Sequence, residues 1–369
     1  MRRILLLLTT VAMGTLVLAA CVPKAAPTSP TTPTVDAAKR RPPPSTSSTS
    51  STTTSSTSST TSTSTTSTTT TSTTTTSTTQ PPSGGGWAQN GPLGSCTVFP
   101  ADNSWNRDVS ALPVDANSAN YVNAITALGG NQKLHADFGG AGAYGIPYIT
   151  VPGTQPLVPV TFVAYGSESD PGPYPIPLAA PIEGGSDRHV LAVDRDHCKL
   201  YELFAATSGA GSWSADSGAV FDLTSNALRP EGWTSADAAG LPIFPGLVRY
   251  DEVASGHINH ALRFTVSSTQ RAYLHPATHY ASSSTDPNLP PMGLRLRLKA
   301  TFDVSSFTGQ SRVVLDALKK YGLIVADNGS NWFITGAADT RWNDNDLNQL
   351  KTVPGSAFEV VNTGESLHK

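Results

Sequence analysis

The sequence predicts a mainly β domain, arranged as a β-sandwich or jelly roll with a few peripheral helices and a C-terminal α+β layer. Three observations lead to this fold class. Gly and Pro, 31 and 29 of the 369 residues, interrupt the chain throughout. The short runs between them are rich in Val, Ile, Tyr and Phe, which favour strands. Clear helical periodicity appears only late in the chain, which is typical of a sandwich with peripheral helices.

The predicted strands are short and are bounded by turn residues. Each run concentrates β-branched and aromatic residues over a length that suits a strand rather than a helix. Eight segments meet this description: 147–151, 158–165, 189–194, 199–205, 218–223, 257–266, 271–275 and 294–302.

Three predicted helices accompany these strands. Residues 311–321, "SRVVLDALKKY", place apolar residues at helical spacing and are followed by a glycine that ends the helix. Residues 343–350 form a weaker helix. An early helix over 118–128 has Ser118 as its N-cap and two glycines after its end. The late helices alternate with the apolar runs "GLIVADNG", "NWFITG" and "AFEVV", so we expect an α+β layer packed on the sheet.

The first residues form a targeting segment rather than part of the fold. A basic start and a short apolar run make residues 1–20 a signal peptide. The run ends in "LAAC", which resembles the lipobox of bacterial lipoproteins. This resemblance implies that Cys21 becomes the lipidated first residue of the mature chain. The alternative is an ordinary cleaved signal peptide followed by a chance cysteine.

A Pro-, Ser- and Thr-rich stretch follows over residues 21–83. Because this composition has no apolar surface to bury, we predict a disordered stalk that lifts the remaining chain away from the membrane. Residues 84–369 then form a single globular domain, long enough for a sizeable core. This organisation predicts an extracytoplasmic lipoprotein, anchored to the membrane and displayed at the cell surface.

Charge and cysteine content narrow the class of protein. The formal net charge is -3 and no basic stripe is present, so nucleic acid is excluded as a partner. Contact with the membrane is expected through lipidated Cys21 only. Two further cysteines, Cys96 and Cys198, most simply form one disulfide in an exported domain. That bond would tie the start of the domain to its body.

The stretch "HINHALRFTV" alternates like a half-buried strand. In this interpretation His260 shares a face with the apolar residues that follow it, whereas His257 and Arg263 point to the other side. The strand "LRLRLKATF" directs its leucines to the core and places cations on the other face, namely Arg295, Arg297 and Lys299. If the two strands are neighbours, Arg263 joins this row. Such a face suits carboxylates, sulfates or sugar hydroxyls, and the alternative is a solvated or salt-bridged face.

Histidine spacing gives only a weak signal for a metal site. The two histidines of "HINH" point to opposite faces of a strand, so they cannot share a metal. "HPATH" would offer His275 and His279 if a helix began at Pro276, with His189 or a carboxylate completing the site. Because no compact ligand signature is present, we expect neither a metal nor any other cofactor.

The long segment 225–253 is too apolar to be disordered, so we expect it to be packed. Within it, Trp233 lies close in sequence to Asp237, an arrangement that is common where a sugar ring stacks on an aromatic face. In the alternative, Asp237 belongs to the first turn of a helix that Thr234 or Ser235 caps.

Further carboxylates stand in other settings. The rigid loop 167–177, "SESDPGPYPIP", displays Asp170 and Tyr174 on a path that its prolines fix, although plain turn chemistry is the alternative. Glu202 lies on a strand and either faces away from the core or partners a buried arginine. Asp251 and Glu252 are adjacent, so on an extended chain their side chains point to opposite sides. Only one of them can then face a given site, and we favour Glu252.

Five segments together resemble an uncharacterised group of secreted bacterial proteins. They are "FPADNSWNRDVSALPV", "LRPEGWTSADAAGLPIFPGLVRYDEV", "HINHALRFTV", "PPMGLRLRLK" and "ALKKYGLIVADNG". The resemblance spans about residues 95–361. It implies one continuous domain and brings no activity to any position.

These features predict a surface-tethered enzyme that acts on polysaccharide, either a glycoside hydrolase or a polysaccharide lyase. The sequence contains no GxSxG, HExxH or P-loop motif, each of which would indicate a different class of enzyme. A hydrolase needs two carboxylates that face one bond, and the candidates are Asp170, Glu202, Asp237 and Glu252. A lyase would use Arg263 or Arg295 to neutralise a uronate and His260 as the base.

The predicted substrate-binding residues are aromatic, cationic or polar, and they are Trp233, Arg263, Arg295, Tyr174 and His189. The alternative function is a non-catalytic glycan-binding module of the lectin or adhesin kind. In both cases the expected partner is a polysaccharide or a cell-wall glycan.

Overall fold

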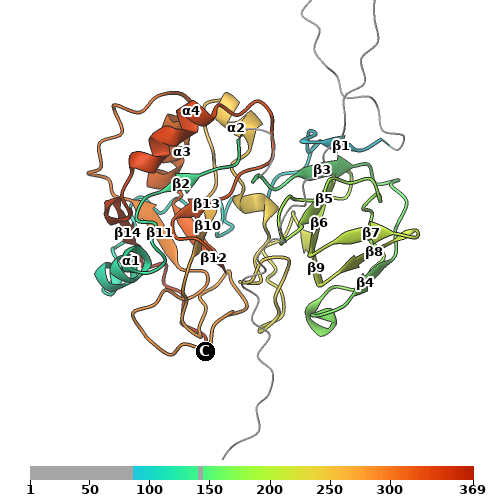
Figure 1. The fold of residues 1–369 in the computed structure, drawn as a ribbon, viewed down its shortest axis with the longest axis horizontal. Coiled ribbons are helices and arrows are strands. Elements are labelled where there is room, and N and C mark those ends of the chain that lie inside the picture. Colours follow the sequence, from blue (N-terminus) through green and yellow to red (C-terminus); the bar gives the residue numbers. More distant parts are fainter. Residues whose placement is uncertain (1–85, 140–143) are drawn as a thin grey trace, which may run out of the picture. The chain divides into compact units, whose positions relative to one another are not determined.

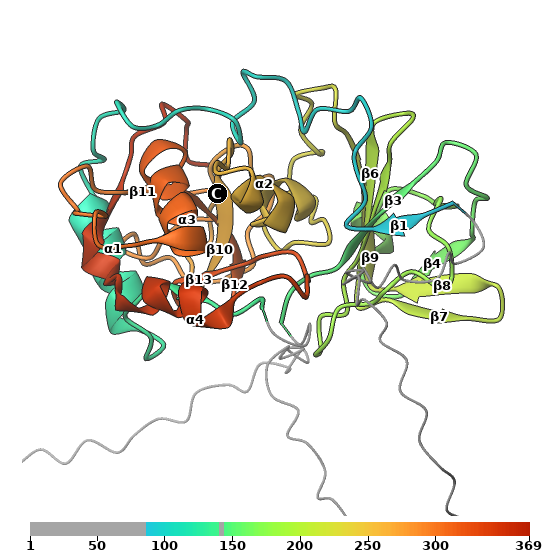
Figure 2. The same ribbon diagram turned by 90° about the horizontal axis from the view of Figure 1, so that it is seen from above.

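The strands of the described structure form three β-sheets (Figures 1 and 2). The computed structural model describes residues 86–139 and 144–369, which all fall within one of the chain's two units, Ser77–Lys369. The predicted signal peptide and stalk, Cys21 included, lie outside these residues. No helix in the described ranges is long and apolar enough to cross a membrane.

The first sheet has five strands in the order β1-β3-β5-β6-β9. Their bounds are β1 Ala88–Gln89, β3 Tyr148–Val151, β5 Val190–Asp194, β6 Lys199–Phe204 and β9 Ser217–Asp222. Strands β3 and β5 are parallel, and every one of their residues is buried. Because side chains alternate along a strand, Leu191 and Val193 enter one hydrophobic cluster while Val190 and Ala192 enter another. The sheet therefore has a core on each face.

A three-stranded sheet contributes to the smaller of these two clusters. Its order is β4-β8-β7, with β4 Val160–Phe162, β7 Thr207–Gly209 and β8 Ser212–Ala215. Trp213 of β8 is fully buried, and its indole N–H donates to the carbonyl of Ile176 at 3.0 Å. The ring thus fills the cluster while its one polar atom stays satisfied.

The third sheet has six strands in the order β14-β11-β12-β10-β13-β2. Their bounds are β2 His135–Ala136, β10 Leu262–Val266, β11 Arg295–Leu298, β12 Leu323–Asn328, β13 Phe333–Ile334 and β14 Phe358–Val360. The neighbours β10 and β12 are parallel, and β12 follows helix α3 in the chain. Both strands supply buried apolar residues to the larger cluster, among them Leu262, Phe264, Leu323 and Val325.

Helices are few and mostly short. They are α1 Ser118–Ala127, α2 Tyr250–Ala254, α3 Gly309–Lys320 and α4 Asp344–Leu347, with 3-10 turns η1 Gly166–Glu168, η2 Phe244–Gly246, η3 Asn348–Thr352 and η4 Gly355–Ala357. Helix α3 buries Val314 and Leu318, four positions apart, in the larger cluster. Asp346 of α4 accepts hydrogen bonds from the N–H groups of Gln310 and Ser311, which the first turn of α3 leaves without helical partners.

The prediction of a mainly β domain with a few peripheral helices is confirmed. Strands β3, β5, β6 and β9 and helices α1 and α3 lie within one or two residues of their predicted bounds. One detail of α1 differs. Asn117 rather than Ser118 occupies the N-cap position, and the hydroxyl of Ser118 instead accepts a hydrogen bond from the N–H of Val360.

Three predicted extended segments are wrong. Residues 257–261 precede β10 instead of belonging to it, because the N–H of Ala261 donates to the carbonyl of Trp105 rather than to a strand. Residues 271–275 make only isolated bridges at Tyr273. Glu252 lies in helix α2, not on an extended chain, so the alternation argument for it fails.

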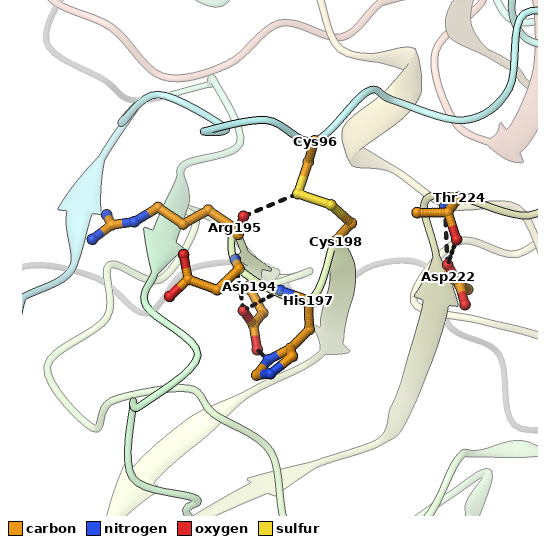
Figure 3. Close-up of a disulfide and its surroundings, with 8 residues drawn as sticks. Cys96, Asp194, Arg195, His197, Cys198, Asp222 and Thr224 are labelled. Atoms are coloured by element: carbon orange, nitrogen blue, oxygen red, sulfur yellow. Dashed lines mark hydrogen bonds and ion pairs between the residues drawn. A yellow bond between two sulfur atoms is a disulfide. The ribbon is translucent and has the colours of Figure 1, made fainter.

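The predicted disulfide joins Cys96 to Cys198 with an S–S distance of 2.03 Å (Figure 3). Cys198 stands in the tight turn between β5 and β6. Asp194 closes this turn by accepting hydrogen bonds from the N–H groups of Asp196 and His197, both at 3.0 Å, and from the His197 ring at 2.7 Å. The bond therefore ties the N-terminal segment to a rigid hairpin, and a disulfide of this kind is typical of oxidising, extracytoplasmic compartments.

Replacing both cysteines, Cys96→Ala with Cys198→Ala, is expected to lower the free energy of unfolding by about 2–5 kcal/mol. The reason is that the two positions are 102 residues apart, so the bond removes much of the entropy of the unfolded chain. Urea denaturation of the wild type and of the double variant measures the difference. A reductant should lower the free energy of unfolding of the wild type to that of the variant, and it should not change the value for the variant. Equal stability of the oxidised wild type and the variant would contradict the prediction.

Candidate functional site

A pocket of about 460 Å³ lies at the ends of β10, β12 and β13. These strands are neighbours in the six-stranded sheet (Figure 1). Arg263 and Thr265 line the pocket from β10, and Asp327 lines it from β12. The segment before β5 contributes a second group of polar lining residues, namely Glu183, Asp187 and His189. The pocket thus collects charged side chains from both the six-stranded sheet and the loop that leads into the five-stranded sheet.

A register shift in β12 directs Asp327 into this pocket. Arg263 pairs with Ile324, but Thr265 pairs with Asp327, so the ladder passes over Ala326. Residues paired across neighbouring strands share a face, and an extra residue on one strand exchanges the faces of all that follow. The irregularity therefore places Asp327 on the same face as Arg263 and Thr265. A regular ladder would place Ala326 there.

Arg263 forms a buried bidentate ion pair with Asp237. Its Nε and Nη2 donate to the two carboxylate oxygens at 3.0 and 2.9 Å, and its Nη1 donates to the hydroxyl of Thr335 at 2.6 Å. Both charged side chains are almost inaccessible to solvent. Burial lowers the pKa of Arg263, but the charge of Asp237 outweighs this effect and raises the pKa overall. The guanidinium is consequently a fixed cation at the pocket wall.

Asp327 is a pocket-lining carboxylate whose environment favours the neutral acid. Burial raises the pKa of Asp327 to about 7, and the nearby charge of Asp237 adds to this shift. Arg263 and the N–H of Asn328, which donates to Oδ1 at 2.7 Å, act in the opposite direction but do not cancel it. Asp327 therefore holds a proton over a range in which an ordinary aspartic acid is ionised.

Glu183 and His189 form a second charged pair. The ring Nδ1 of His189 lies 2.5 Å from the Glu183 carboxylate, and its Nε2 lies 3.0 Å from the carbonyl oxygen of Ala236. Since both ring nitrogens face acceptors, this environment favours the doubly protonated imidazole. Burial lowers the pKa of His189, but the hydrogen bond and the charge of Glu183 outweigh burial and raise it.

An aromatic stack borders the same pocket. Phe333 of β13 and His135 of β2 are paired in register, and their rings stack with centroids 3.9 Å apart. Burial and the charge of Lys351 lower the pKa of His135, although Asp137 acts in the opposite direction. A neutral imidazole on a phenyl ring presents a flat, largely apolar surface beside the charged groups.

Of the sequence-predicted site residues, the pocket brings together Arg263 and His189, with Asp237 directly behind Arg263. Asp237 is not in a helical turn. Its N–H donates a hydrogen bond to the hydroxyl oxygen of Ser235 at 2.9 Å, and the backbone there forms a bend. Its carboxylate is fully engaged by the arginine, so it acts on Asp327 and Arg263 through its charge rather than by direct contact with a ligand.

Glu252 and His260 lie together elsewhere. Glu252 binds Arg249 at 2.5 Å and the Nε2 of His260 at 3.1 Å, and His260 also contacts the carbonyl of Ala261. Burial raises the pKa of Glu252, but Arg249 and His260 outweigh it and lower this pKa to about 2. Neither residue lines the pocket, and Glu252 is a poor proton donor.

Asp170, Tyr174 and Trp233 form another separate cluster. Arg229 binds Asp170 at 2.5 Å, and its guanidinium lies 5.7 Å from the centre of the Trp233 ring. The hydroxyl of Tyr174 is buried and donates to the backbone carbonyl of Asp170 at 2.7 Å. These contacts hold the rigid loop in place and leave Tyr174 no access to a ligand.

Glu202 and the arginine row are also buried. Glu202 accepts hydrogen bonds from the N–H groups of Ile243 and Phe244 at 2.9 Å, and burial raises its pKa to about 7. Arg263 and Arg295 both pair with Ile324, so the predicted row does form across β12.

Its β11 members, Arg295 and Arg297, are nevertheless covered rather than open to an anionic ligand. Arg295 donates to the backbone carbonyls of Tyr321, Ser104 and Arg107. Arg297 binds Glu359 at 2.8 Å and further carbonyls of the segment 109–112. The N-terminal segment therefore closes this face, and burial lowers the pKa of Arg295 to about 9.

Sequence reasoning missed Asp327, Glu183, Phe333 and His135. A signal for Asp327 was present, because the apolar run "LIVA" changes there to the polar "DNGSN", which marks the end of a buried strand. No local pattern links the other three to the pocket. Comparison with protein-family models, curated proteins and solved structures gives no match to this chain.

Proposed function

We propose that this protein is a surface-anchored enzyme that hydrolyses polysaccharide, with the pocket around Asp327 as its active site. The observation that carries the proposal is that Asp327 and Glu183 line one pocket in different electrostatic settings. Asp327 is kept neutral by burial and by the charge of Asp237, whereas Glu183 faces the imidazolium of His189. Carboxyl groups whose environments differ in this way commonly divide the roles of acid and base.

In the proposed reaction Asp327 is the general acid. Its carboxyl group donates a proton to the glycosidic oxygen as the bond to the leaving sugar breaks. Glu183 is the base that activates water, or the nucleophile that attacks the anomeric carbon. His189 positions Glu183 through its 2.5 Å contact, and Arg263 supplies a cation that stabilises the Asp327 carboxylate formed after proton transfer.

The lining of the pocket supports a sugar as the ligand. The stacked rings of Phe333 and His135 provide a flat surface for the apolar face of a pyranose. Around it, the hydroxyl, amide and carboxylate groups of Thr265, Asn328 and Asp187 offer donors and acceptors for ring hydroxyls.

The proposed location agrees with this substrate. Lipidation at Cys21 and the Ser/Thr-rich stalk would hold the domain outside the membrane, close to cell-wall or environmental glycans. The Cys96–Cys198 disulfide supports an oxidising compartment.

The test is to incubate the purified full chain with bacterial, plant and algal polysaccharides and to analyse the products by mass spectrometry and ultraviolet absorbance. Saturated oligosaccharides are the expected products. Unsaturated, ultraviolet-absorbing ends would indicate a lyase and overturn the assignment of Asp327 as general acid. Glycan binding without any product would overturn the enzyme in favour of a lectin-like module.

A further inference from the structure

Three side chains from distant parts of the sequence converge outside the pocket described above. They are Glu231, His275 and His368, and one ligand atom of each lies within 4.8 Å of the corresponding atoms of the other two. All three are at least partly accessible to solvent, so an ion can reach them. We propose that this cluster, called here the Glu231 cluster, binds a zinc ion. The proposal does not depend on the proposed hydrolase.

The donor set matches the chemistry of zinc. Two imidazoles and one carboxylate are a common zinc ligand set, and zinc binds such atoms at about 2.0–2.2 Å. Donors around one tetrahedral ion then lie roughly 3.3 Å apart, within the observed spread. The rings of His275 and His368 approach each other, with centroids 4.3 Å apart, so both can face the same ion.

One ligand, Glu231, also has an outer partner at its second carboxylate oxygen. Its Oε1 faces the Nε2 of His275 at 2.6 Å, and the Nδ1 of His275 lies 3.9 Å from Glu365, beyond hydrogen-bond distance. The other oxygen of Glu231 accepts a hydrogen bond from the hydroxyl of Tyr273 at 2.5 Å. Such outer contacts orient the ligands of metal sites, and an isolated ion pair between a carboxylate and a histidine does not require them.

The backbone holds these ligands in place. His368 exchanges two backbone hydrogen bonds with Tyr273, at 3.0 and 2.9 Å, and its ring stacks on the Tyr273 ring at 5.1 Å. The N–H of Gly232 donates to the carbonyl of Thr278 at 2.7 Å and fixes the turn that carries Glu231. Zinc would therefore join three segments that are already close, at little cost in ordering.

This site differs from the arrangement that the spacing of "HPATH" suggested. Residues 275–279 are not helical, and the ring of His279 instead faces the backbone carbonyl of Ala238 at 2.8 Å. His275 is thus brought together with His368, not with His279.

The experiment is a calorimetric titration of the chelator-treated full chain with zinc chloride. We expect one zinc per chain in the wild type. Loss of an outer partner alone lowers metal affinity about 10–100-fold, so His368→Ala and Glu231→Gln should each weaken binding by at least ~100-fold. Tyr273→Phe should weaken it by about 10-fold or more. His197→Ala is the matched control, since it removes an exposed histidine that is paired with a carboxylate outside the cluster.

A second readout separates this site from binding elsewhere. Zinc should slow amide hydrogen exchange at His368 and Tyr273 in the wild type and in His197→Ala, but not in Glu231→Gln. Circular dichroism verifies that each variant folds, and His368→Gln replaces His368→Ala if the latter does not. The proposal is overturned if the wild type binds zinc no more tightly than His368→Ala, or if His197→Ala loses binding to the same extent.

Discussion

Replacing Arg263 by methionine is expected to lower the free energy of unfolding by about 3–5 kcal/mol. The substitution leaves the carboxylate of Asp237 buried without its cation, because both of its oxygens are held by Arg263 in the wild type. It also removes the cation that offsets the repulsion between Asp237 and Asp327. Urea denaturation at neutral pH measures the loss.

A double-mutant cycle tests whether the loss comes from the unpaired carboxylate. Adding Asp237→Asn to Arg263→Met removes the stranded charge, so the two changes should couple by about 1–3 kcal/mol. The control is Arg312→Met, which breaks a solvent-exposed ion pair with Asp316 and should cost less than about 1 kcal/mol. A loss at Arg263 no larger than that of the control would contradict the argument.

Replacing Asp327 by asparagine is expected to reduce kcat on a cleaved polysaccharide by at least ~100-fold, with KM nearly unchanged. The reason is that asparagine keeps the shape of the side chain but cannot donate the proton to the leaving oxygen. In the wild type the acid must be protonated, so activity should fall as pH rises through the pKa of Asp327 near 7. The residual activity of the variant should not show this fall at high pH.

The same variant has a readout that needs no substrate. The folded-state pKa of Asp327 is raised above its unfolded value of 3.8, so ionisation of this group costs stability as pH rises above that value. Asp327→Asn should therefore raise the free energy of unfolding at pH 8 by at least ~1 kcal/mol and have little effect at pH 4. Asp286→Asn, in an exposed turn, is the control. Unchanged activity together with unchanged stability at pH 8 would contradict both parts of the argument.

Much of the fold could be predicted because its signals are local. The alternation of Val, Ile and Leu with turn residues located β3, β5, β6 and β9, and the apolar spacing of 311–321 located α3. The disulfide followed from cysteine count alone. Where local preference misled, distant backbone partners decided the structure. The alternation of residues 257–261 predicted a strand, yet the N–H of Ala261 donates a hydrogen bond to the carbonyl of Trp105, more than 150 positions earlier.

The candidate site was less predictable, although its chemistry was partly anticipated. Arg263, His189 and Asp237 were singled out from the sequence, but their partners Thr335, Glu183 and Asp327 were not. Glu252 was favoured on the assumption of an extended chain, and Asp170 because it lies in a rigid proline-rich loop. In the structure each is held by an arginine, Arg249 and Arg229 respectively. A sequence shows which residues can carry charge but not which charges neutralise one another.

The sequence by itself therefore determined the class of fold, the positions of β3, β5, β6 and β9 and the pairing of Cys96 with Cys198, since each depends on composition or short-range periodicity. Tertiary structure alone decided the role of each charged residue. A one-residue irregularity in β12 turned Asp327 to the face of Arg263, and the approach of distant segments joined Glu231 to His275 and His368. The physical reason is that pKa, burial and ligand geometry depend on distances of a few ångströms between residues far apart in the chain, which periodicity does not encode.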